Sequence, residues 1–214
     1  MIKNQEKAKG MVQRRLSETK MEALQSQMNP HFIFNAMNSI QNYIIDHNID
    51  EALHYMGAFS KLIRQTLNHS SKSSIPLSDE IIYLNTYITL ENNRFNNKIG
   101  VQITIDEAVD ADGIEIPPML IQPFVENVFV HAFDHQSIKP SLEIHFYIAG
   151  DYLVATITDN GKGMGGAPLQ KLNESKGIML VKERLALFDA HNSNPIAITS
   201  ELGGGTKVQI NIAL

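Results

Sequence analysis

The chain has 214 residues, of which 43% are hydrophobic and 19% charged, with a formal net charge of −5 and no cysteine. This length allows one or two domains with a hydrophobic core, and the negative charge argues against nucleic acid as a direct partner. The lack of cysteine excludes disulfides and thiolate chemistry. No apolar run reaches the roughly 18 residues that span a membrane, so we expect a cytoplasmic chain, attached to a membrane only through an upstream segment.

Residues 1–20 contain six basic and two acidic side chains and only a weak apolar pattern. This composition is typical either of a solvated helix end or of a helical linker that carries a signal from an upstream module. We predict the linker.

A helical pattern begins at Pro30-His31 and continues to about His47. Proline suits the first turn of a helix, where its missing N–H would have no partner. An apolar stripe recurs at helical spacing, formed by Ile33, Met37, Ile40 and Ile44. A polar stripe follows on the opposite side, formed by His31, Asn35, Asn38 and Asn42. The pattern therefore predicts that His31 is presented at the start of the helix, away from the apolar stripe.

A second helical pattern opens at Ile49 and carries a heptad-like seam, formed by Leu53, Met56, Ser60, Ile63 and Leu67. The short connection predicts an antiparallel hairpin. One hairpin cannot bury both seams, so we predict a four-helix bundle made by two chains. A serine-rich break over 70–76 is the expected domain boundary, and a third helix is predicted to run from an N-cap at Ser78 to Arg94, with Glu80 in its first turn.

The C-terminal half alternates apolar and polar residues over 101–105, 142–148, 153–157, 196–198 and 208–212. Alternation indicates strands with one buried face, in a mainly antiparallel sheet. Helical patterns over 119–133 and 177–191 interrupt the strands. The predicted architecture is an α/β sandwich with helices on one side of the sheet.

Polar and glycine-rich motifs interrupt this half at three places. Glu126, Asn127 and His131 lie in the helix over 119–133, with Asn127 and His131 one turn apart. The third strand ends in Asp159-Asn160-Gly161-Lys162-Gly163-Met164, and Gly203-Gly204-Gly205-Thr206 joins the last two strands. The long stretch over 165–177 is typical of a lid or of a disordered segment. Each motif alone is weak, since an Asp-Asn-Gly turn is usually a hairpin loop, but their order is informative.

In this order the motifs resemble the GHKL nucleotide-binding fold of gyrase, histidine kinases and MutL. More narrowly, residues 24–40 (LQSQMNPHFIFNAMNSI) resemble the signature of LytS-type sensor histidine kinases. The likeness covers residues 20–212. It implies a linker over 1–20, a dimerisation and phosphotransfer hairpin over 21–74 and an ATP-binding domain over 75–214.

The resemblance also implies a role for individual residues. His31 would be the phosphoacceptor, with Asn35 in the same motif, and Glu126 would assist the transfer. The nucleotide and its magnesium would be held by further residues. Asn127 would bind Mg²⁺, His131 would lie near the phosphates and Asp159 would accept a hydrogen bond from the adenine amino group. The glycine boxes and lid would contribute Gly161, Gly163, Gly177, Gly204, Gly205 and Thr206.

General chemistry agrees with these roles. An imidazole with a pKa near 6.5 is largely neutral at pH 7 and has a lone pair that attacks phosphorus. Magnesium bound to a nucleotide needs few protein ligands. Many histidine kinases have an acidic residue directly after the phosphoacceptor, where this chain has Phe32, as is usual for the LytS type. The chain departs from the family at Val130, Ser175 and Leu180, where phosphate or lid contacts are expected.

Three functions remain open from the sequence. The first is a homodimeric histidine kinase that uses Mg-ATP and passes its phosphoryl group to a response regulator, in this family often a DNA-binding protein of the LytTR type. The alternative is a degenerate GHKL module that binds nucleotide and dimerises without turnover. The third is an ATPase of the gyrase or MutL class, which would leave residues 20–70 unexplained.

Overall fold

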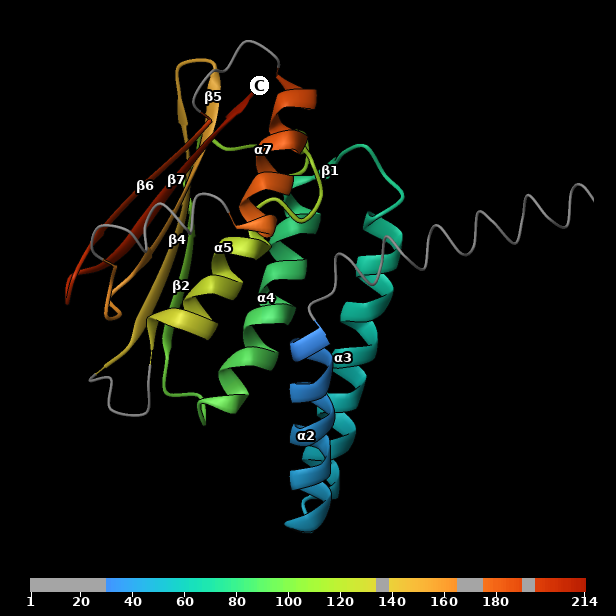
Figure 1. Ribbon diagram of the computed structural model, residues 1–214. Coiled ribbons are helices and arrows are strands. Elements are labelled where there is room, and N and C mark those ends of the chain that lie inside the picture. Colours follow the sequence, from blue (N-terminus) through green and yellow to red (C-terminus); the bar gives the residue numbers. More distant parts are fainter. Residues whose placement is uncertain (1–29, 134–138, 165–174, 190–194) are drawn as a thin grey trace, which may run out of the picture. The chain divides into compact units, whose positions relative to one another are not determined.

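The computed structural model describes residues 30–133, 139–164, 175–189 and 195–214. The chain divides into two compact units, one ending at Ser71 and one beginning at Lys72 (Figure 1). The predicted linker over 1–20 and most of the predicted lid lie outside the described residues.

The first unit contains a helical hairpin of α2 (Pro30–Ile45) and α3 (Ile49–His69). The turn between them uses His47 with a positive φ of 56° and a hydrogen bond from the Asn48 N–H to the Tyr43 carbonyl. Aromatic rings meet between the helices, with centroid distances of 6.0 Å for Phe32–Phe59 and 6.1 Å for Tyr43–Tyr55. The interhelical core is therefore built around aromatic side chains.

The face that α2 buries differs from the predicted stripe. Phe32, Ala36 and Ile40 are buried, whereas Met37 and Ile44 are exposed. The predicted stripe is thus divided: Ile40 is buried within one chain, whereas Met37 and Ile44 belong to the surface that one hairpin was not expected to bury. Phe32 adds a large ring to the buried face, while Phe34 on the same helix is 69% exposed.

The predicted seam of α3 is also uncovered within one chain. Its packed residues include Ala52, Tyr55 and Leu62. A set of large apolar side chains on the two helices stays exposed, and we call it the exposed seam: Met37, Ile44, Leu53, Met56 and Leu67.

The second unit contains a five-stranded sheet in the order β2-β4-β5-β7-β6. Its strands are β2 (Gly100–Ile105), β4 (Ser141–Ala149), β5 (Tyr152–Asp159), β6 (Ile196–Glu201) and β7 (Gly205–Ala213). Strand β2 pairs with β4 in parallel, and the other pairs are antiparallel. The predicted antiparallel character therefore holds except at the β2 edge. There Ile105 is 40% exposed, because an edge strand has a neighbour on one side only.

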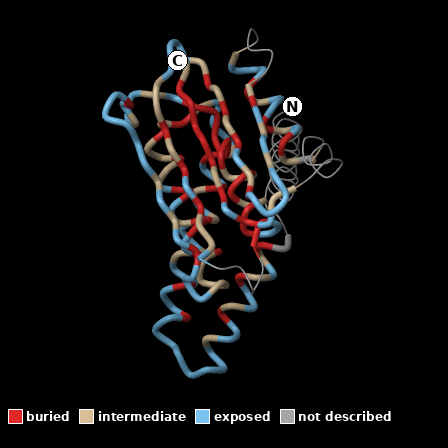
Figure 2. Tube along the Cα trace, turned by 90° about the vertical axis from the view of Figure 1, so that its left-hand side faces the viewer, coloured by how far each residue is buried: buried red, intermediate tan, exposed pale blue. Residues whose placement is uncertain are grey.

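Three helices cover one face of this sheet (Figure 1). They are α4 (Leu77–Arg94), α5 (Gln122–Asn127) and α7 (Lys176–Phe188), and α5 continues into a π-helical turn, η1 (Val128–Ala132). The predicted α/β sandwich is thus confirmed. Buried residues follow the strands and the helix sides that face them (Figure 2). Phe188 was predicted to point inward but is 39% exposed.

A short second sheet pairs β1 (Ile75–Pro76) with β3 (Glu115–Ile116) just before α4 begins. Pro76 occupies the N-cap position of α4 and makes no side-chain cap. The predicted cap at Ser78 was therefore wrong, because α4 begins directly after β1 and its N-cap lies two residues earlier than predicted. None of the helices in the described ranges is long and apolar enough to cross a membrane.

Candidate functional site

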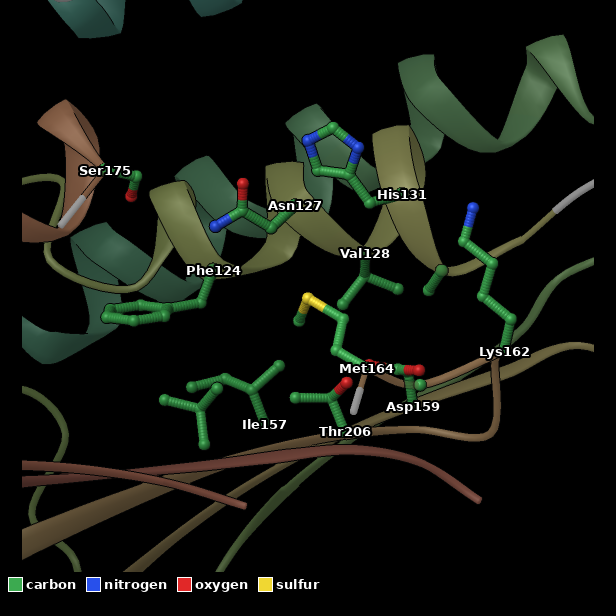
Figure 3. A pocket seen from close by; sticks show the side chains of 13 residues that line it. Phe124, Asn127, Val128, His131, Ile157, Asp159, Lys162, Met164, Ser175 and Thr206 are labelled. Atoms are coloured by element: carbon green, nitrogen blue, oxygen red, sulfur yellow. The ribbon is translucent and has the colours of Figure 1, made fainter. Parts of the chain in front are cut away.

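The α/β unit contains a cavity of about 380 Å³ that combines a polar end with apolar walls. Figure 3 shows side chains of the α5–η1 stretch on one wall and side chains from the strand ends opposite them. The lining residues are Phe124, Asn127, Val128, His131, Ala132, Ile157, Asp159, Lys162, Gly163, Met164, Ser175, Thr206 and Val208. Cavities of this size are typical of small-ligand sites.

Asn127 and His131 line the same wall, as their spacing predicts. Asn127 is the last residue of α5, and His131 lies in η1 (Figure 3). The apolar side of this stretch is buried through Phe124, Val125 and Val128, which fixes the helix to the unit's core. Single π-helical turns within helices are frequent at functional sites, because the wider turn redirects side chains.

Asp159 lies at the end of β5 and is 5% exposed. Its carboxylate accepts a hydrogen bond from the Gly161 N–H at 2.8 Å and another from the Thr206 N–H. Burial raises the pKa of Asp159 above its usual value, and the two backbone N–H groups act in the opposite direction. The Asp159 carboxylate is therefore a hydrogen-bond acceptor whose position at the polar end of the cavity is fixed by the backbone.

Two glycines beside Asp159 are required by backbone geometry. Gly163 and Gly205 have positive φ values of 62° and 80°. A Cβ on Gly163 would lie 1.8 Å from the Glu201 carbonyl oxygen, and one on Gly205 would lie 2.0 Å from the Asp159 carbonyl oxygen. The two glycine motifs thus pack closely against neighbouring backbone at the polar end of the cavity.

Backbone hydrogen bonds tie the turn after β5 to its neighbours. The Lys162 N–H donates to the Ala132 carbonyl at 3.0 Å, and the Gly203 N–H donates to the Lys162 carbonyl at 2.7 Å. The end of η1, the turn after β5 and the β6–β7 turn are therefore held as one piece.

The buried side chain of Glu80 fixes the segment that leads into α5. Glu80 in α4 is fully buried and accepts the N–H groups of Met119 at 2.9 Å and Ile121 at 3.1 Å. Arg184 in α7 donates to the Pro118 carbonyl at 2.8 Å. Burial raises the pKa of Glu80 to about 7, although these N–H groups and the Arg184 charge lower it. The chain leading to Asn127 is thus held by α4 and α7.

Most of the predicted site residues lie in the wall of the cavity or beside it. Asn127, His131, Asp159, Gly163 and Thr206 line the cavity. Next to it lie Gly161, Gly204 and Gly205, while Gly177 is in the first turn of α7.

The remaining predicted residues lie apart from the lining. Glu126 is half-buried in α5 and is not among the lining residues. His31 and Asn35 lie in the first turns of α2, which belongs to the other unit.

The sequence prediction missed several residues that shape the site. Lys162 and Met164 line the cavity but were noted only as spacers between glycines. Glu80 was predicted only as an acidic residue in the first turn of its helix, and its burial was not foreseen. Ser200 in β6 carried no motif and nevertheless contacts both glycine turns. Only Lys162 could have been found from sequence, as a basic residue within a nucleotide-type motif.

The donor set of the cavity fits a magnesium ion that arrives with a nucleotide. Asn127 offers one amide oxygen at the wall, and no group of three or more potential acidic, histidine or cysteine ligands occurs in the described part of the chain. Nucleotide-bound magnesium takes most of its oxygens from phosphates and water, so one protein ligand suffices.

Comparisons with known proteins show which proteins share this fold. The family model described as histidine kinase matches residues 19–99. The histidine kinase domain of the blue-light activated kinase EL346 from Erythrobacter litoralis is similar in fold, with a TM-score of 0.53, 17% identity, and coverage of 93% of this chain and 95% of that one. The fold is thus the one found in histidine kinases.

Curated relatives narrow the class. The sensor protein LytS of Bacillus subtilis is 30% identical over 209 residues, which covers 93% of this chain and 34% of the relative. LytS of Oceanobacillus iheyensis is 33% identical over 170 residues, covering 76% and 28%. The chain belongs to the LytS-type sensor histidine kinases, and it spans about a third of the length of these relatives.

Proposed function

We propose that this chain transfers the γ-phosphoryl group of Mg-ATP to His31 and then to an aspartate of a response regulator. The observation that supports this most is the cavity, where Asp159 faces Asn127 and His131 across apolar walls. The same chain carries a Pro30-His31 helix start in a separate unit. A site and an acceptor on separate units suit a reaction in which the acceptor must also be reached by a second protein.

Each wall of the cavity matches a part of ATP. Asp159 would accept a hydrogen bond from the adenine amino group, and Ile157, Val208 and Met164 would contact the base. Asn127 would hold the magnesium, with His131 near the phosphates. Lys162 brings a basic side chain to the lining and suits a polyanionic ligand. This charge offsets the lack of a basic residue at Val130.

The transfer needs few protein groups besides these. A ring nitrogen of His31 forms the N–P bond while the bond from the γ-phosphorus to the bridging oxygen breaks, and ADP leaves with that electron pair. The imidazole then loses a proton, for which Glu126 is the proposed acceptor. In the second step an aspartate oxygen of the regulator takes the phosphoryl group from His31. A regulator of the LytTR type is the partner that the family suggests.

The hairpin supplies the argument for a dimer. Its exposed seam is apolar on both helices, whereas apolar faces of soluble helices are normally covered. We propose that a second copy of residues 21–74 covers it in a four-helix bundle, with residues 75–214 forming the ATP-binding domain.

The decisive experiment uses Mg-ATP labelled at the γ-phosphate with three proteins: the parent, His31→Ala and His54→Ala. His54 is an exposed histidine of α3 in the same unit and serves as the matched control. We expect acid-labile, alkali-stable label on the parent and on His54→Ala, and none on His31→Ala. ATP binding should be equal in all three.

Other outcomes assign other functions. Label that persists on His31→Ala would contradict the assigned acceptor. A parent that binds ATP but takes no label would favour the degenerate nucleotide-binding module. Steady phosphate release without a labelled protein would favour an ATPase of the gyrase or MutL class.

A further inference from the structure

Ser200 connects the two glycine turns beside the cavity. Its hydroxyl oxygen lies 2.7 Å from the Met164 backbone nitrogen, 3.0 Å from the Gly205 carbonyl oxygen and 2.9 Å from the Thr206 hydroxyl oxygen. Two of these partners, Met164 and Thr206, line the cavity directly. One half-buried serine on β6 therefore touches both sides of the cavity's polar end.

The positions of the protons follow from what each partner can do. The Met164 N–H only donates, so the Ser200 oxygen accepts there. The Gly205 carbonyl only accepts, so Ser200 uses its single proton on that bond. The remaining contact, with Thr206, then requires the threonine to donate its proton to Ser200. This leaves the Thr206 oxygen with lone pairs and no proton for a ligand.

The result is a cavity end with two side-chain acceptors for a ligand's hydrogen bonds. One is the Thr206 hydroxyl oxygen, and the other is the Asp159 carboxylate, which also accepts the N–H groups of Gly161 and Thr206. An amino group on a purine finds acceptors there. A carbonyl at the same position of the ring would face oxygen lone pairs and would lose its hydrogen bonds, which costs affinity.

We propose that Ser200 is a specificity-determining positioning residue, which locks the Thr206 hydroxyl as an acceptor and so favours amino-purine over keto-purine nucleotides. This inference rests on the proposed nucleotide binding. It assigns to Ser200 an effect exerted through Thr206, without contact to the ligand.

The test compares ATP with inosine triphosphate, which carries a carbonyl in place of the adenine amino group. Affinities are measured by calorimetry on the full chain. The parent should prefer ATP, and Ser200→Ala should reduce this preference roughly fivefold, because the freed Thr206 hydroxyl can turn its proton toward a carbonyl. Ser200→Thr keeps the hydroxyl and should keep the preference. A ratio of two affinities is unaffected by the fraction of folded protein.

A variant without the Thr206 hydroxyl tests whether Ser200 acts through that group. In Thr206→Val, which has no hydroxyl, adding Ser200→Ala should leave the ratio unchanged. A persisting change would show that Ser200 acts through the Met164 turn, and would overturn the inference. Equal loss of both affinities in Ser200→Ala would overturn it as well. A parent that binds neither nucleotide would instead contradict the proposed function itself.

Discussion

The hairpin and the α/β unit differ in how completely they bury their apolar side chains. In the hairpin, Leu53 and Met56 are 59% and 45% exposed within one chain. In the α/β unit, the inward residues of the central strands, such as Phe146 and Ile210, are completely buried. The α/β unit thus completes its core from a single chain, whereas the hairpin leaves large apolar side chains exposed, which is the basis of the proposed dimer. The difference suits the proposed roles, since a binding cavity needs rigid walls and a phosphoacceptor helix must remain accessible.

The most damaging change to the self-contained unit should be Gly205→Ala. The added Cβ would meet the Asp159 carbonyl, and the backbone is in the left-handed region. Overpacking and strain together predict a loss of at least ~3 kcal/mol in the free energy of unfolding, measured by urea denaturation.

Gly203→Ala is the matched control for this prediction. Gly203 has φ +77° in the same turn, with nothing within 4 Å of an added Cβ. Its loss should be limited to the backbone cost of about 1–2 kcal/mol. Equal losses in the two variants would show that close packing between the glycine turns contributes nothing.

For the hairpin, the sensitive property should be the association of two chains. Met56→Lys places a charge in the exposed seam and should convert a dimer into monomers at micromolar concentration, as measured by sedimentation. Each copy loses the burial of one large side chain, so about 3 kcal/mol of association energy is removed per dimer.

Leu187→Lys provides the control for association. This side chain in α7 is 90% exposed but lies outside the seam, so the variant should remain dimeric. A monomeric parent, or a dimer that survives Met56→Lys, would mean that the exposed seam is not the interface.

The smallest effect concerns pH and the α/β unit alone. Burial raises the pKa of Glu80 from 4.5 to about 7. Since the folded state then binds a proton that the unfolded state has released, stability should fall as pH rises from about 4.5 to about 7 and level off above that. The full change is at most about 3 kcal/mol, because one pKa unit corresponds to about 1.4 kcal/mol.

Glu80→Gln should flatten this slope in thermal melts between those pH values, even though the variant loses a backbone contact. Glu143→Gln, at an exposed position of β4, should keep the slope of the parent. An unchanged slope in Glu80→Gln would show that Glu80 keeps one protonation state over this range.

Residue patterns alone predicted most of the elements. Alternation located strands such as 142–148, and helical spacing placed Asn127 and His131 on one helix face. Asp159 was placed at the end of a strand by the same alternation, but its role at a binding site came from the resemblance of the ordered motifs to the GHKL fold. These features are readable because periodicity reports which side of a single element is apolar.

Tertiary structure decided what each element meets. Glu80 looks like a surface acid in sequence but reaches N–H groups 39 and 41 residues away. Ser200 has no motif, and its importance comes from two turns that meet at β6. In the hairpin, α2 buries Phe32 and Ala36 beside Ile40, while Met37 and Ile44 of the predicted stripe stay exposed within one chain. Such contacts depend on packing between distant segments, and the periodicity of one segment carries no information about its neighbours.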